Sequence, residues 1–444
     1  MRSNDVKYLA LHHPEYIAMV ERNYWVNFVL LTLDMACYNF AFTMFSQDTI
    51  LPFFVSHLTR SALLSGMVPA LYFLGNFFPQ LLGAFMANRV SSRKWQIFGI
   101  AVTQRLGLLM IALTVQKLDL LPRNFVLVFF FLSYAFYTSA NGIIWPAYAD
   151  FTSKAIIRKR GLFYGVSFGL GGLVGFGASA LASRLLSQLA YPHNLQVLFW
   201  LGFSSSFISP FLMAAFREVK YPEKVRAESL KEFLGSIPRR VQAYPVFVRY
   251  LVTRALIGMG LMGNAFYAVY AIEHFQMGAG SLGIFSMVLL FSQSLLGLLW
   301  GTLGDRFGYK KVLLAAAGLI GLEAVFALLA RTGWQFFGIA IFMGGVYAAG
   351  NIADPNLIFE IIPPSETSRY IGIANTLLGP VYALAPLLGG LLVDRFSHQA
   401  MFLAVLGLAV VGFLAAWKWM VEPRSRRGKY EKVGDIPNSQ LPVV

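Results

Sequence analysis

An acidic residue inside a long apolar run is the strongest indication of chemistry in this sequence. Asp34 lies roughly 12 residues beyond Arg22, or about 18 Å along a helix, which places its carboxylate near the middle of a bilayer. Charges at that depth are costly and usually functional. A proton can neutralise a desolvated carboxylate, as a proton-coupled carrier requires. The structural alternative is an aspartate permanently paired with an arginine.

Three more ionisable residues interrupt apolar runs. Arg105 and Arg254 are the arginines available to pair with Asp34, although Arg254 lies close enough to its helix end for the guanidinium to reach water. Asp354 directly precedes Pro355, where it is placed either to contact a substrate or to serve a gate. Asp34, Arg105, Arg254 and Asp354 are therefore the candidates for proton coupling.

Uncharged polar and aromatic residues inside the runs are candidates for lining a substrate path. Each alone is better explained by a hydrogen bond between helices. As a set they predict a weakly polar, aromatic cavity that suits an amphipathic organic solute. They are Tyr38, Asn76, Asn141, Trp145, Asn264, Tyr267, Gln293, Asn351, Asn375 and Tyr382.

The composition indicates which elements position these residues. Only 13% of the 444 residues are charged and 57% are hydrophobic, whereas soluble domains carry about 25% charged residues. Apolar runs of roughly 20 residues recur, the length that a membrane-spanning helix needs. Because lipid offers no hydrogen-bond partners, each run is predicted to be a helix. The twelve predicted spans are 24–53, 62–87, 95–116, 122–148, 161–186, 194–216, 245–273, 281–304, 310–330, 334–361, 369–393 and 399–420.

Lysine and arginine are concentrated in every second connection between the spans. The segment 217–244 and the tail 422–444 are rich in them, whereas the intervening connections hold few. Positive residues stay on the cytoplasmic side, which predicts a multi-pass protein of the plasma membrane with both termini in the cytoplasm. This topology explains the net charge of +15 without nucleic-acid binding.

Matching residues recur in the two halves of the chain. Pro146 and Pro355 are 209 positions apart, 355 minus 146, and Arg160 and Arg369 are separated by the same number, 369 minus 160. Parallel repeats of this kind are a recurrent transporter plan. The predicted division is a cytoplasmic segment 1–23, a six-helix bundle 24–216, a cytoplasmic linker 217–244, a second six-helix bundle 245–421 and a cytoplasmic tail 422–444.

A short motif follows the eighth predicted span. It reads Gly301-Thr-Leu-Gly-Asp305-Arg306-Phe-Gly308-Tyr309-Lys310-Lys311. This resembles the signature G-x-x-x-D-R-x-G-R-K of the major facilitator superfamily, with Tyr309 in place of the first basic residue. Together with twelve spans, two halves and a long central loop, the resemblance covers essentially the whole chain.

The resemblance implies an all-α fold of twelve transmembrane helices in two pseudo-symmetric six-helix bundles, working as a monomer. It implies that Asp34 faces a central cavity and that Arg105, on a peripheral helix, has a packing role. It also implies that Asp305 accepts hydrogen bonds from the start of the helix at Arg160 and latches the cytoplasmic side. The alternative is that Gly301, Asp305, Arg306, Gly308, Lys310 and Lys311 only anchor the topology.

The corresponding loop of the first half has Asn88 and Ser91 where the family pattern has Asp and Gly, so the family's rules about that gate do not carry over to it. Two other departures weaken a drug-exporter assignment. In the fifth span Leu170 stands where drug-proton antiporters of the family carry a proline, and the fourth span lacks their arginine.

The predicted function is secondary active transport of a small organic, amphipathic solute by alternating access, coupled to protons through Asp34. A lipid or glycolipid translocase on the same fold and a non-transporting membrane assembly factor are the alternatives. The sequence contains neither a phosphate-binding G-x-x-x-x-G-K-[ST] loop nor an H-E-x-x-H metal motif. We therefore expect no enzymatic activity, cofactor or metal, and as partners only membrane lipid, the solute and the proton.

Overall fold

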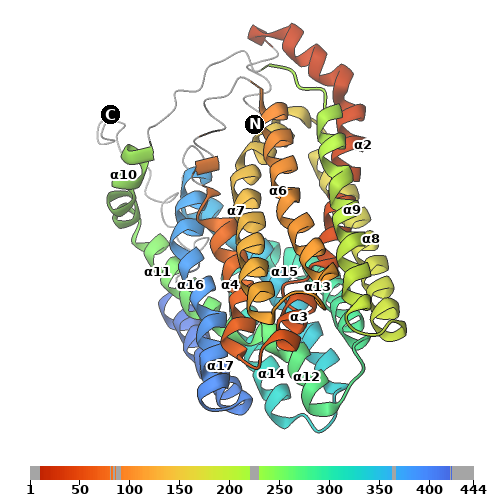
Figure 1. The fold of residues 1–444 in the computed structure, drawn as a ribbon. Coiled ribbons are helices and arrows are strands. Elements are labelled where there is room, and N and C mark those ends of the chain that lie inside the picture. Colours follow the sequence, from red (N-terminus) through yellow and green to blue (C-terminus); the bar gives the residue numbers. More distant parts are fainter. Residues whose placement is uncertain are drawn as a thin grey trace.

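The computed structural model describes residues 11–80, 82–83, 86, 92–220, 230–362, 367–420 and 422. Throughout these residues the regular elements are helices, and they run side by side as one elongated bundle (Figure 1). The predicted all-α class is confirmed.

The helices of the first half follow the predicted spans closely. The first begins at Pro14 instead of residue 24, because proline suits the first turn of a helix. It ends at Met44, and a separate short helix follows where the sequence predicted one continuous span 24–53. The elements are α2 Pro14–Met44, α3 Ile50–Leu58, α4 Ala62–Phe77, α6 Arg93–Gln116, α7 Arg123–Ala155, α8 Arg160–Gln188 and α9 His193–Ala215.

The second half begins after a helix in the predicted linker, α10 Leu230–Ala243. Its first span is interrupted by a short 3₁₀ segment, η1 Gly260–Gly263. The remaining elements are α11 Pro245–Met259, α12 Asn264–Phe275, α13 Ser281–Phe307, α14 Tyr309–Leu329, α15 Gln335–Ile361, α16 Thr367–Arg395, α17 His398–Leu414 and η2 Ala415–Trp419.

Eleven helices of the described chain are long and apolar enough to cross a membrane, with α11, η1 and α12 forming one of them. The remaining predicted span, 62–87, contains the shorter apolar helix α4. The chain is thus a multi-pass membrane protein, as the sequence predicted.

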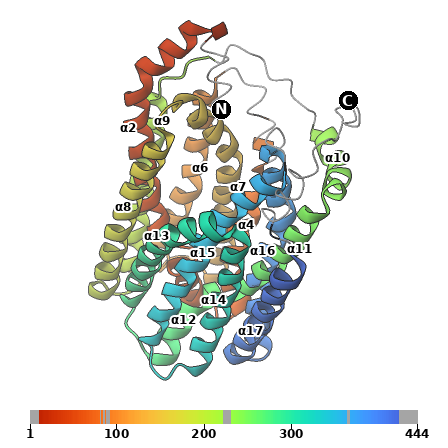
Figure 2. The same ribbon diagram turned by 180° about the vertical axis from the view of Figure 1, so that it is seen from behind.

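Two helix pairs form the main contacts between the halves. Within the first half α2 packs on α8 and α9, and within the second α13 and α14 pack on α15. Between the halves α8 packs on α13 and α4 packs on α16 (Figures 1 and 2), and we call these two contacts the seams. Helix α12 makes smaller contacts with α3 and α4.

The closest contacts across the seams lie at one end of the bundle, although Asn375 and Gln80 also hydrogen-bond across the halves toward the other end. A Cβ added at Gly66 would lie 2.2 Å from the Pro386 carbonyl oxygen, and one added at Gly283 would lie 2.3 Å from the Ser183 nitrogen. A Cβ added at Gly301 would meet nothing within 4 Å. We call the end that holds α3 and α12 the closed end and the end that holds α10 the open end (Figure 1).

Candidate functional site

A cavity of about 310 Å³ lies within the bundle, and most of its walls come from the first half. That volume is at the lower end of the range for small-molecule sites. Its lining residues are Asp34, Met35, Tyr38, Asn39, Gln104, Arg105, Asn141, Ile144, Trp145, Tyr148, Phe168, Ser209, Met213, Gln293 and Asn351. Only Gln293 and Asn351 belong to the second half.

Asp34 is connected to Arg105 through a serine. The Ser209 hydroxyl donates to Asp34 Oδ1 at 2.5 Å, and Arg105 Nη2 donates to Ser209 Oγ at 2.7 Å. Tyr148 donates its hydroxyl proton to Asp34 Oδ2 at 2.8 Å. The carboxylate is 3% exposed and makes no direct ion pair with an arginine of the described chain. The relayed contact differs from the permanent pair that was the structural alternative.

A proline explains how Arg105 is held. Pro210 lies inside α9 and has no backbone N–H, so the carbonyl four residues earlier, that of Ser206, loses its helical partner. Arg105 Nε donates to this Ser206 oxygen at 3.0 Å. The guanidinium also donates to the Ala101 carbonyl at 3.3 Å and to the Gln104 side chain. A carbonyl freed by the proline in α9, together with acceptors on its own helix α6, thus fixes the arginine beside the cavity.

Three side-chain amides next to Arg105 form a row of hydrogen bonds between helices of the first half. Gln104 Nε2 donates to Asn141 Oδ1 at 2.9 Å, and Asn141 Nδ2 donates to Asn76 Oδ1 at 2.5 Å. Asn76 in turn donates to the Tyr72 carbonyl at 2.8 Å. The row connects α6, α7 and α4, so Asn76 serves a contact between helices, whereas Asn141 also lines the cavity.

The second half contains a direct ion pair. Arg254 Nε lies 2.7 Å from Asp354 Oδ1, and Nη2 donates to Oδ2 at 2.7 Å. The Tyr382 ring lies 5.6 Å from the guanidinium carbon. Arg254 is 8% exposed, so it neither reaches water nor pairs with Asp34. This pair joins α11 to α15 and is separate from the cavity lining.

The structure places the other predicted cavity residues in two groups. Tyr38, Trp145, Gln293 and Asn351 line the cavity together with Asn141. The rest lie outside the lining. Asn264 donates to the Tyr347 hydroxyl at 3.0 Å, Tyr267 stacks on Phe402, Asn375 donates to Gln80 at 3.2 Å across the halves, and Tyr382 packs beside Gly258.

Several cavity residues were not identified from the sequence. Tyr148 and Ser209 are the two donors to Asp34, and Phe168 contributes an aromatic wall, its side chain 61% exposed. The proline in α9 was the available signal for Ser209, because it marks a helix turn with a free carbonyl group.

The motif lies across the junction of α13 and α14 instead of in a loop, and it forms its own local contacts. The Tyr309 hydroxyl donates to Asp305 Oδ1 at 2.6 Å, so the tyrosine that replaces a basic residue still engages the aspartate. Gly308 has φ of 92°, which favours glycine, and Lys310 donates to the Trp417 carbonyl at 2.9 Å. Arg306 and Lys311 lie over the Phe307 ring. The latch between Asp305 and the start of α8 stays a prediction.

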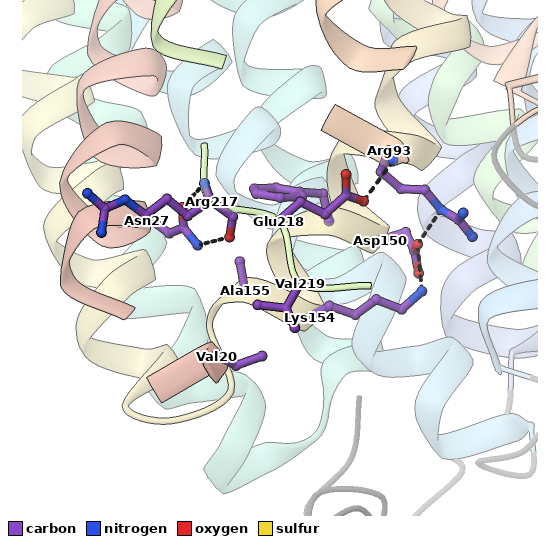
Figure 3. A pocket seen from close by; sticks show the side chains of 10 residues that line it. Val20, Asn27, Arg93, Asp150, Lys154, Ala155, Arg217, Glu218 and Val219 are labelled. Carbon is purple, nitrogen blue, oxygen red and sulfur yellow. Dashed lines mark hydrogen bonds and ion pairs between the residues drawn. The ribbon is translucent and has the colours of Figure 1, made fainter. Parts of the chain in front are cut away.

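A charged cluster of the first half lies at the open end, whereas Asn88 and Ser91 fall outside the described residues. Glu218 accepts from the N–H groups of Arg93 at 2.7 Å and Lys94 at 3.1 Å, where a carboxylate is favoured by the start of α6 (Figure 3). Asp150 pairs with Arg93 at 3.1 Å and Lys154 at 2.8 Å. The adjoining cavity of about 40 Å³ is too small for an organic solute.

The chain resembles known transporters in sequence and in fold. Residues 251–442 match the family model described as Major Facilitator Superfamily. The "Multidrug resistance protein MdtG" of Citrobacter koseri is 29% identical over 217 residues, 44% of this chain and 52% of that protein. MdtG of Yersinia enterocolitica is 29% identical over 140 residues, 31% of this chain and 33% of the relative. The matches thus span a third to a half of the relatives' length.

Solved structures extend the likeness over most of the chain. The nucleoside transporter NupG has a TM-score of 0.68 at 15% identity, covering 88% of this chain and all of its own. A bacterial homologue of the iron transporter ferroportin, in an inward-facing state, has a TM-score of 0.66 at 14% identity and covers 88% of this chain and 98% of its own. At such identities the likeness is one of fold.

Proposed function

We propose that this chain is a secondary transporter of the major facilitator superfamily, which couples the movement of a small amphipathic organic solute to that of protons. The observation that carries the proposal is the position of Asp34. Its carboxylate lines the cavity and is held by the hydroxyl donors Ser209 and Tyr148. A proton and a solute would therefore compete for, or share, one site.

The solute class follows from the walls of the cavity. Trp145 is 53% exposed and stacks on Tyr148 with ring centroids 6.4 Å apart, which offers a flat aromatic surface. Gln293 and Asn351 face them from the second half as uncharged hydrogen-bonding groups. Such walls suit an aromatic solute that is neutral or carries one positive charge, since a cation is attracted to aromatic faces and to Asp34.

Alternating access would work by rocking the halves about the two seams. The close contacts of Gly66 and Gly283, with the Asp48–Tyr347 and Thr49–Ser286 hydrogen bonds, hold the halves together at the closed end. With the open end in the cytoplasm, as the basic connections predict, this is an inward-facing state. The opposite state requires these contacts to separate while the ends near Gly301 approach.

The cavity does not favour a lipid translocase. A volume of about 310 Å³ accommodates a solute of drug size or smaller, but not a lipid with two acyl chains. The assembly-factor alternative has no cavity requirement, so it is distinguished by experiment.

Uptake into proteoliposomes with an imposed pH gradient tests the proposal, using aromatic amines and their neutral analogues as solutes. The Asp34→Asn variant is expected to lose at least about 100-fold of gradient-driven transport, because an amide does not exchange a proton at this site. Solute exchange without a gradient should persist. Glu273→Gln, a change at an exposed carboxylate of the closed end, is the matched control.

Unchanged dependence of transport on the pH gradient in the Asp34→Asn variant would remove Asp34 from coupling. Absence of transport for every solute, together with stable co-purification of a membrane partner, would favour the assembly factor instead.

A further inference from the structure

A second buried carboxylate lies where the two halves meet. Asp48 is in the turn between α2 and α3 and is 8% exposed. The Tyr347 hydroxyl of α15 donates to Asp48 Oδ1 at 2.9 Å, and Asn264 Nδ2 donates to the Tyr347 oxygen at 3.0 Å. Both donors come from the second half, whereas Asp48 belongs to the first.

No positive charge balances this carboxylate within the described chain. The ion pairs there are Arg93–Asp150, Lys154–Asp150, Arg158–Glu21 and Arg254–Asp354. The titratable groups that face Asp48 are the phenols of Tyr347 on α15, Tyr72 on α4 and Tyr134 on α7, and its own turn adds the amide of Gln47. An ionised carboxylate buried among neutral groups carries a desolvation penalty of several kcal/mol.

The residue next to Asp48 shows that this turn belongs to the closed end. The Thr49 and Ser286 hydroxyls lie 2.9 Å apart and connect the turn to α13 of the second half. Both side chains are buried. Because the partners of Asp48 and Thr49 lie on the opposite half, these contacts exist only while the closed end stays shut, and separation of the halves would admit water to the carboxylate.

We propose that Asp48 is a proton-binding site whose occupancy is tied to closure of this end of the bundle. When the end opens, water solvates the carboxylate and the proton leaves to solvent. When it closes, the carboxylate is desolvated without a counter-charge, and a proton from solvent binds to Oδ2 while Tyr347 keeps donating to Oδ1. Low pH then favours the closed arrangement. The inference rests on the proposed alternating access and adds a proton site separate from Asp34.

A second carboxylate at the same interface provides a built-in comparison. Asp394 at the end of α16 accepts from the Ala62 N–H at 2.6 Å, the Leu63 N–H at 3.0 Å and the Ser61 hydroxyl at 2.8 Å. This carboxylate is exposed and sits at the start of α4, where the helix dipole favours its charge. It joins the halves as Asp48 does, but in the closed arrangement its ionised form is still stabilised by water and by the start of α4.

Distance measurements between spin labels test the proposal. Gln188 and Gln276 are exposed, lie at the closed end and belong to opposite halves, so both are changed to cysteine for labelling. Cys37 is the only native cysteine and is replaced by serine. The measurement is made in lipid nanodiscs without solute. The ratio of molecules with separated labels to molecules with close labels should rise with pH by up to about tenfold per pH unit, as expected for one linked proton.

The variants separate the roles of the two carboxylates. Asp48→Asn mimics the protonated form, so the distances should stay closed and lose their pH dependence. Asp394→Asn should lower the closed fraction at every pH but keep the pH dependence. Tyr347→Phe removes a hydrogen bond that Asp48 receives only in the closed arrangement. The closed arrangement is therefore weakened, and the midpoint of the transition to separated distances should move to lower pH.

Three results would overturn the proposal: a pH-independent parent, an Asp48→Asn variant with the parental pH dependence, or an unchanged midpoint in Tyr347→Phe if Asp48→Asn does not fold. The readout needs no transport. Failure to find a transported solute would count against the proposed function alone, and transport with a pH-independent closed end would count against Asp48 alone.

Discussion

The two halves of the molecule each bury an arginine and an aspartate, but they connect them differently. In the first half Ser209 stands between Arg105 and Asp34. In the second half Arg254 and Asp354 touch directly through two contacts of 2.7 Å. Both arginines are nearly inaccessible, at 4% and 8% exposure. The difference lies in what each aspartate can still bind.

A direct, two-point ion pair leaves its carboxylate committed to one partner. Protonating Asp354 would leave Arg254 buried with an uncompensated charge, which is costly. Asp34 is held by hydroxyl groups, which can reorient, and Arg105 keeps its acceptors on Ser206 and Ala101 if the carboxylate is neutralised. The comparison therefore supports the proposal of proton exchange at Asp34, with the Arg254–Asp354 pair serving cohesion of the second half.

The largest expected effect is on folding stability in the second half. Asp354→Asn should lower the free energy of unfolding by about 3–5 kcal/mol, because Arg254 remains buried without its partner. Asp34→Asn should lower it by about 1 kcal/mol, since Ser209 can still donate to the amide oxygen and the Tyr148 hydroxyl can turn to accept from the amide nitrogen. Denaturant titration in detergent measures both, and the double change Arg254→Met with Asp354→Leu should recover most of the loss. Equal destabilisation by the two single variants would contradict the difference between the direct and the relayed charge pair.

The middle-sized effect concerns the serine between the charges. Ser209→Ala keeps Asp34 and Arg105 but removes a hydrogen bond to a charged group, which is worth about 1.5–3 kcal/mol. Gradient-driven transport should therefore fall roughly tenfold or more, and its pH profile should shift. Ser205→Ala is the matched control, because Ser205 lies on the same helix and donates to the Cys37 carbonyl at 3.1 Å. A parental pH profile in Ser209→Ala would mean that Asp34 exchanges protons independently of Arg105.

The sequence revealed the charges of the site but not their connections. Asp34 stands out in any apolar run, and Tyr38, Asn141 and Trp145 were identified as cavity residues because polar and aromatic groups are costly or distinctive there. Arg105 was assigned a packing role by analogy with peripheral helices. It does join α6 to α9 through the carbonyl group freed by a proline, and it also lines the cavity.

Other misplacements have physical causes in the backbone. The 3₁₀ segment Gly260–Gly263 has about three residues per turn, so the residues after it rotate away from the face that a continuous helix would give them. Asn264 and Tyr267 consequently lie outside the cavity lining. Asp48 was absorbed into the predicted span 24–53, because a turn flanked by two apolar helices gives no break in hydrophobicity.

The smallest expected effect tests whether the proline sets the geometry of the first-half site. Pro210→Ala restores a backbone N–H that can bond to the Ser206 carbonyl, where Arg105 Nε now donates at 3.0 Å. The new N–H would compete with Arg105 for this oxygen and weaken the hydrogen bond by about 0.5–1.5 kcal/mol, so gradient-driven transport should fall by roughly two- to tenfold. The unfolding temperature should stay the same or rise, because proline is the poorest helix former.

Pro355→Ala provides the matched control in the second half. Pro355 lies inside α15 beside Asp354, but the ion pair there is made by side chains and needs no freed carbonyl group. Its alanine variant should therefore keep the pH profile of the parent. If both alanine variants changed the pH profile equally, the two prolines would act through helix flexibility common to both halves. The difference between a relayed and a direct charge pair would then not explain the pH profile.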